Sequence, residues 1–235
     1  MKRALLATVA LVALATVPAR ADIVFLGQQD LGGLGFGAFP RMLTLQTTTI
    51  ESGSVTPVDV VHGDAIAGAD KSTTPTIAAL NWMSGADAKL AFNADTSATG
   101  ITVDNLIMTV FNGTTAIGSF SLPSPVTFSA AQVAAEQGNG NGVFVFGLNA
   151  AEQLQFNTIL AMTGSADFRV GLNSTLGCGP SAPAGCLVTN DGPDTYLGIV
   201  NPVPAPVVGA GLPALLSGLL GMVGLARYRR KRRIV

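Results

Sequence analysis

A run of 20 uncharged, mostly apolar residues, 207–226, lies near the C-terminus. As a helix it would measure about 30 Å, the thickness of the hydrocarbon core of a bilayer. Lys and Arg resist translocation, so the basic residues that follow the run are expected to stay on the cytoplasmic side. These stop-transfer residues are Arg227, Arg229, Arg230, Lys231, Arg232 and Arg233. The pattern predicts a C-terminal transmembrane helix that places the rest of the chain across a membrane.

The N-terminus has the three parts of a secretory signal peptide. Lys2 and Arg3 form the charged start, and residues 4–17 form an apolar run that is too short to span a bilayer. Ala19 and Ala21 then flank Arg20 in the small-x-small pattern that signal peptidase cleaves. We therefore expect residues 1–21 to be a signal helix. Because no Cys follows the cleavage site, a lipid anchor there is not expected.

Charge is distributed very unevenly along the chain, although the formal net charge is only −1. All 14 acidic residues lie between Asp22 and Asp194, where only four residues are basic, so this middle part carries a formal charge of −10. Such an acidic surface argues against binding to nucleic acid or to anionic lipid.

Two cysteines, Cys178 and Cys186, bracket a short loop rich in Gly and Pro. Two thiols are too few for a metal site, and their spacing is not the C-x-x-C of a redox pair. We expect them to form a disulfide, which agrees with export to an oxidising compartment.

Between the two ends, residues 22–200 show short apolar stretches separated by Gly, Pro, Asn, Asp and Thr. This pattern predicts a single mainly β domain, an antiparallel β-sandwich that is jelly-roll-like, with one or two short helices. The expected strands are 23–26, 42–50, 54–62, 76–82, 88–93, 143–146, 168–172 and 195–200.

Turn and cap residues sharpen three further predictions in this domain. Asn112-Gly113 favours a tight turn in a hairpin that spans residues 101–122. Ser129 and Gln132 form a capping box for a helix over residues 130–137, and a second short helix is expected after Asn149.

The residue types that carry chemistry do not cluster. His62, the single histidine, has Asp64 two residues away but no Gly-x-Ser-x-Gly motif to accompany it, so we interpret it as a polar strand-end residue. Trp82 is flanked by apolar residues and is expected in the core rather than on a sugar-binding platform. The turns 138–142 and 191–194 could offer oxygen ligands to calcium, but neither has EF-hand spacing, and we expect no metal site and no cofactor.

The last 33 residues combine Val203, Pro204, Ala205 and Pro206 with the apolar run and the basic end. This order resembles the PEP-CTERM sorting signal of Gram-negative bacteria, with Ala205 where the usual motif has Glu. The resemblance implies that residues 201–235 are processed by an exosortase, a membrane-embedded protease or transpeptidase-like enzyme. It further implies release or attachment at the cell surface and association with matrix exopolysaccharide.

These observations predict an exported surface or extracellular-matrix protein with a structural or interaction role and no catalytic activity of its own. Its precursor would be tethered to the inner membrane before it reaches the surface. Two alternatives stay open on the same export route. One is a polysaccharide- or calcium-binding module, and the other is a permanently membrane-anchored periplasmic protein.

Overall fold

The structure is a computed structural model, and it describes residues 22–30, 36–94, 100–136, 142–189 and 192–200. The expected signal peptide, residues 1–21, and the expected sorting tail, residues 201–235, lie outside the described residues. In the part of the chain that is described, no helix is both long and apolar enough to cross a membrane.

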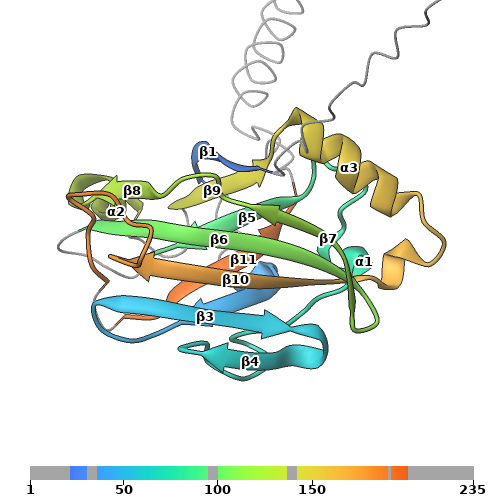
Figure 1. Ribbon diagram of the computed structural model, residues 1–235, viewed down its shortest axis with the longest axis horizontal. Helices are drawn as coiled ribbons and strands as arrows, with labels where there is room; N and C mark the ends of the chain where they lie inside the picture. The colour runs from blue at the N-terminus through green and yellow to red at the C-terminus, as the bar shows by residue number, and fades with distance from the viewer. Residues whose placement is uncertain (1–21, 31–35, 95–99, 137–141, 190–191, 201–235) are drawn as a thin grey trace, which may run out of the picture.

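Two antiparallel sheets form the body of the molecule (Figure 1). One sheet has the strand order β1-β9-β5-β11-β2, and the other has the order β4-β3-β10-β6-β7, with β8 also paired to β6. The first sheet contains β1 (Ile23–Asp30), β2 (Arg41–Leu45), β5 (Lys89–Asn93), β9 (Gly142–Leu148) and β11 (Asp194–Ile199). The second contains β3 (Ile50–Thr56), β4 (Val60–Gly63), β6 (Gly100–Asn112), β7 (Thr115–Ser121), β8 (Val126–Ser129) and β10 (Arg169–Gly177). The predicted mainly β, sandwich-like fold is confirmed.

Strands that are consecutive in the chain often lie in different sheets. The chain crosses between the sheets from β2 to β3, from β4 to β5, from β5 to β6, from β8 to β9, from β9 to β10 and from β10 to β11. As a result β11, the last strand, pairs with β5 on one side and with β2 on the other. Long-range pairing of this kind joins the two ends of the domain.

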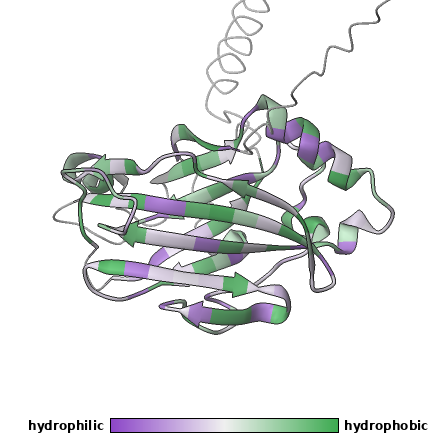
Figure 2. Ribbon diagram, in the orientation of Figure 1, coloured by the Kyte–Doolittle hydropathy of each residue, from purple (hydrophilic) through white to green (hydrophobic). Residues whose placement is uncertain are grey.

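Apolar side chains from both sheets fill one continuous core. Within it Phe128 of β8 stacks on Phe144 of β9, with ring centroids 3.7 Å apart, and Phe92 stacks on Tyr196 at 4.7 Å. Figure 2 shows hydrophobic residues recurring along the strands of both sheets. Alternation of inward and outward side chains along each strand produces this single shared interior.

The hairpin and both predicted helices are present. β6 and β7 form the hairpin, with Gly113 in the turn at φ 61°. Helix α2 (Ala130–Glu136) starts with the predicted capping box, in which the Ser129 amide donates to Gln132 Oε1 and the Gln132 amide donates to Ser129 Oγ. Helix α3 (Ala150–Leu160) is longer than expected, and Asn149 Oδ1 caps it by accepting from the amides of Ala151 and Glu152.

The expected strand 76–82 is instead a third helix, α1 (Ile77–Leu80). Thr76 Oγ1 accepts a hydrogen bond from the Ala79 amide, which caps the first turn, and Asn81 ends the helix in the left-handed conformation. Apolar residues in so short a segment do not distinguish a helical period from a strand period, and the two capping residues decide the outcome.

Two other expected strands are divided in the structure. Residues 42–50 are split by the loop 46–49 between β2 and β3, and residues 54–62 fold into the hairpin of β3 and β4. The hairpin turns at the short 3-10 segment η2 (Pro57–Asp59), where Val58 and Asp59 have φ of 61° and 63°. The carboxylate of Asp59 fixes this turn, because its Oδ1 accepts from both the amide and the hydroxyl of Thr74.

Val58 combines a β-branched side chain with a left-handed backbone and is 69% exposed, so it contributes strain and little core contact. We expect Val58→Gly to raise the free energy of unfolding by about 0.5–1 kcal/mol, because the relief of strain outweighs the added freedom of the unfolded chain. Val60 is also exposed but has an ordinary φ of −78°, so Val60→Gly should lower the same free energy. Urea unfolding of both variants checks the prediction, and equal destabilisation of both would contradict it.

Candidate functional site

Two acidic side chains from opposite sheets meet inside the sandwich. Glu51 lies on β3 of one sheet and Asp194 begins β11 of the other, and both are 0% exposed. Their carboxyl groups are hydrogen-bonded to each other, and Glu51 Oε1 also accepts from the Thr47 amide at 3.2 Å. A carboxyl pair removed from solvent is the most unusual chemical feature of the described chain.

Burial is the main reason why the pKa of Glu51 rises from 4.5 to about 9, and the negative charge of Asp194 is the second. The carboxylate of Asp64 acts in the same direction, whereas the hydrogen bond from the Thr47 amide opposes the rise. Two facing carboxylates repel each other unless something positive lies between them, so near neutral pH the pair holds a shared proton in the absence of another cation.

Two buried hydroxyl groups lie beside the pair, that of Tyr196 on β11, two residues after Asp194, and that of Ser174 on β10. Ser174 Oγ donates to the Asn105 carbonyl at 2.9 Å and therefore accepts from the Tyr196 hydroxyl, also at 2.9 Å. Burial raises the pKa of Tyr196 well above its ordinary value, with smaller contributions from Asp194 and Glu51. The phenol is therefore neutral and serves as a donor near the acidic pair.

The alternation of side chains along the strands places these two acids inside the sandwich. At this point an acidic side chain is buried while its apolar neighbour is exposed. Along β3 the side chain of Ile50 is exposed, while those of Glu51 and Val55 point inward and are buried. On β11, Asp194 and Tyr196 share the inward face. Sequence reasoning named Asp194 only as part of a turn and did not single out Glu51. A signal was available, because side chains two or four residues apart on a strand share a face. Asp194 lies two residues before the inward Tyr196, and Glu51 lies four residues before the inward Val55.

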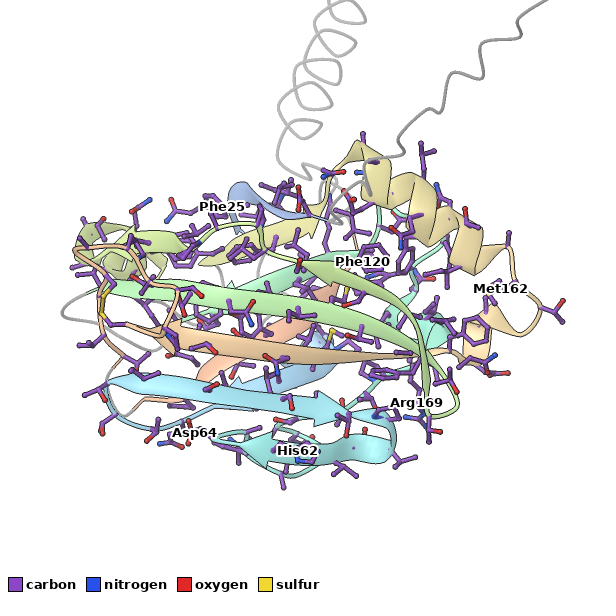
Figure 3. The ribbon with its side chains drawn as sticks, viewed as in Figure 1. Phe25, His62, Asp64, Phe120, Met162 and Arg169 are labelled. Atoms are coloured by element: carbon purple, nitrogen blue, oxygen red, sulfur yellow. A yellow bond between two sulfur atoms is a disulfide. The ribbon has the colours of Figure 1, made fainter. Side chains whose placement is uncertain are left out.

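His62 and Asp64 lie at the end of β4 and just beyond it. His62 is exposed on β4, at the lower edge of the molecule in Figure 3, while Asp64 Oδ2 accepts from the Ser52 amide at 2.8 Å and so joins the end of β4 to β3. This arrangement agrees with the interpretation of His62 as a polar strand-end residue.

Trp82 is in the core, as predicted. It is 1% exposed, its Nε1 donates to the Ile199 carbonyl at 2.8 Å, and its ring meets Phe156 edge to face. Tyr196 is also fully buried. Neither ring is available as a surface platform for a sugar.

Cys178 and Cys186 form the predicted disulfide, with their Cα atoms 5.4 Å apart. The loop that they close and the residue that follows it are each attached to β6. Asp104 Oδ2 accepts from the Ser181 amide, and Thr102 Oγ1 accepts from the Leu187 amide at 2.8 Å. A disulfide of this kind hints at an oxidising, extracytoplasmic environment.

An open cleft of about 740 Å³ lies beside the start of β2, and sequence reasoning did not find it. Phe39, Pro40 and Arg41 form one side, and Asp70 and Ala79 contribute to the rest. Arg41 Nη1 donates to the Asp70 carbonyl at 2.7 Å, which fixes the guanidinium at the cleft. The cleft therefore presents a cation, a carboxylate and an aromatic ring within an otherwise acidic domain.

Comparison with known proteins adds no assignment, since no family model, curated protein or solved structure matches the chain. Of the turns considered as calcium sites, Asp191 and most of 138–142 lie outside the described residues, whereas Asp194 is in the buried pair. Among the residues that the structure covers, no group of three or more His, Cys, Asp or Glu side chains is placed to hold a metal ion.

The raised pKa of Glu51 predicts an unusual dependence of stability on pH. In the unfolded chain this carboxyl titrates near 4.5 and in the folded chain near 9, so between these values the folded state holds the extra proton. The free energy of unfolding should therefore fall as pH rises from about 5 to 9, by up to about 1.4 kcal/mol per pH unit.

Glu51→Gln should flatten this profile and make the variant more stable than the parent at pH 8, because an amide carries no charge. Asp70→Asn, which removes an exposed carboxylate, is the control and should keep the parent slope. Urea unfolding at several pH values with a chelator present measures both effects. A parent whose stability does not change over this range would contradict the prediction.

Proposed function

We propose that the chain is an exported protein of the cell surface or extracellular matrix, with a structural or interaction role. In this proposal an exosortase-type enzyme recognises its C-terminal tail. The chain enters the membrane as a tethered precursor and has no catalytic activity of its own. Its working part is the acidic β domain, residues 22–200, which the processing step releases or attaches at the surface.

The observation that carries this proposal is the order of features in the tail. Pro204 and Pro206 are residues that disfavour a helix in the motif, the apolar run 207–226 has the length that a bilayer requires, and the basic residues 227–233 follow it. A signal-peptide pattern at residues 1–21 and the disulfide between Cys178 and Cys186 support the same export route.

We assign the β domain to the jelly-roll class because of its strand order. The orders β2-β11-β5-β9 and β3-β10-β6-β7 are those of two interleaved Greek keys, a class that also includes lectin and capsid domains.

Mass spectrometry of the protein recovered from the producing cells tests the sorting proposal. The mature chain should begin at Asp22 and end near Val203–Pro206. Replacing both Pro204 and Pro206 by Ala should leave the tail uncut, because the motif can then join the helix that follows it. Substituting Pro180 and Pro183 in the disulfide loop is the control and should leave processing unchanged. If the surface-exposed protein keeps Arg233, the tail is a permanent anchor and the sorting proposal fails.

A second candidate role, saccharide binding, is favoured by the cleft at Arg41. Its guanidinium and Phe39 suit an acidic polysaccharide, since Arg binds carboxylates in a fork and the ring offers an apolar face.

We expect Arg41→Ala to lower affinity for a uronate polymer at least about tenfold in a pull-down assay, whereas Lys89→Ala, on β5, should leave it unchanged. Equal retention of the parent and both variants would remove this candidate.

A further inference from the structure

Helix α3 and the loop that follows α1 lie together at the point where the chain leaves the β domain. Trp82 Nε1 in this loop donates to the carbonyl of Ile199, the last residue of β11, so the end of the domain lies against the loop. The Gly85 amide donates to Asn157 Oδ1 at 2.7 Å, which holds the loop along α3. The chain therefore leaves the domain beside α3.

The surface formed by these two elements exposes large apolar side chains. Met83 is 80% exposed and Leu154, on the outward side of α3, is 70% exposed, the two highest values among the large apolar residues that the structure describes. Met162, just beyond the end of α3, is also exposed (Figure 3). We call the outward side of α3 together with Met83 and Met162 the α3 face.

The parts of the α3 face adjoin one another. The backbone of Gly85, two residues after Met83, lies directly against that of Gln153, the residue before Leu154. Met83 and Leu160, near the end of α3, line the same apolar hollow of about 230 Å³. Single exposed apolar side chains on a protein surface are ordinary, whereas apolar side chains that adjoin at one end of a domain indicate a contact surface.

The outward side of α3 carries no charge, although residues 22–200 carry a formal charge of −10. Between residues 150 and 164 the single charged residue is Glu152, which is 1% exposed. The exposed polar side chains of this stretch are neutral amides and hydroxyls, namely Gln155, Asn157, Thr158 and Thr163. Neutral polar groups mixed with apolar ones suit the headgroup layer of a membrane, where a charge near the apolar region is costly.

The length of the chain between the domain and the apolar run keeps the α3 face near the membrane. Eight residue steps separate Ile199 from residue 207, where the apolar run begins, and an extended chain covers at most about 3.6 Å per step, or about 29 Å in all. If the run spans a bilayer, the end of the domain beside α3 is held within this distance of its surface. A short tether of this kind makes even a weak contact effective.

We propose that the α3 face lies on the surface of the bilayer while the chain is tethered there. This inference rests on the membrane-spanning tail of the proposed function and adds the orientation of the domain. Asp87 and Asp167, close in sequence to Met83 and Met162, favour a zwitterionic lipid over an anionic one. Strand β4, on the opposite side of the molecule from α3 in Figure 1, would point away from the membrane.

The test uses the full-length chain reconstituted in phosphatidylcholine vesicles, with flotation in a density gradient to show that it is inserted. Dilute hydrogen peroxide then oxidises the exposed methionines, and mass spectrometry gives the rate at each one. Met83 should react at least about fivefold more slowly in the parent than in Leu154→Glu, because the added charge lifts the face off the lipid. Val60→Glu, on β4, is the control and should match the parent.

Two buried methionines report whether each variant is folded. Met42 and Met108 are 0% and 1% exposed, so both should resist oxidation in every folded variant. Leu154 and Val60 are both exposed, so neither substitution removes a core contact.

Fluorescence of Trp82, the single tryptophan, gives a second measurement at the same face. Lipids that carry bromine on their acyl chains should quench this fluorescence in the parent and in Val60→Glu, and quench it less in Leu154→Glu. Adding phosphatidylglycerol to the vesicles should speed the oxidation of Met83, because the anionic surface repels the acidic domain.

The outcomes separate this proposal from the one on which it rests. If the parent does not float with the vesicles, the membrane-spanning tail is wrong and the orientation fails with it. If the parent floats but Met83 reacts as fast as in Leu154→Glu, the orientation alone is wrong. Protection that disappears when the protein is diluted in the same amount of lipid would show that the α3 face pairs with a second copy, which also overturns the proposal.

Discussion

Contact between aromatic rings on the inner faces of the two sheets holds the sandwich closed. Phe128 contributes from one sheet, and Phe92, Phe144 and Tyr196 contribute from the other, all of them fully or almost fully buried. A buried ring removes about 150–250 Å² from water, so this group supplies a large share of the apolar driving force. These rings set the distance between the two sheets and thus the space that is left for the other inward side chains.

The polar groups of the interior occupy positions that this packing prescribes. Tyr196 belongs to both systems, because its ring stacks on Phe92 while its hydroxyl donates to Ser174. Asp194, two residues earlier, projects into the same interior and meets Glu51. The apolar core therefore fixes where the two carboxyls meet, and the proton that Glu51 retains there lowers the repulsion between them.

Much of the fold could be predicted, because turn and cap residues carry local information. Asn112-Gly113 located the hairpin, and Ser129 with Gln132 located α2. The prediction of a strand over residues 76–82 was wrong. The apolar residues of this segment fit a helical and a strand period equally well, and the cap at Thr76 was not recognised. The split of 54–62 could not be foreseen, since Val58 rarely adopts a left-handed turn.

The candidate site was harder to predict than the fold. Glu51 and Asp194 are far apart in the sequence and belong to different sheets, and no spacing rule links them. Among 14 acidic residues, only the inward direction of each strand separates a buried carboxyl from a solvated one. The cleft at Arg41 could not be predicted for a similar reason. Asp70 reaches the cleft from a loop, and no local sequence pattern gives the course of that loop.

The place of β11 in its sheet has a consequence for the order of events during synthesis. β2 and β5, made early, face each other across a gap that only residues 194–199 fill, and those residues are the last of the domain to be made. Until they arrive, two strand edges stay open to mispairing with other chains. The domain can therefore complete its fold only after nearly all of it has been synthesised.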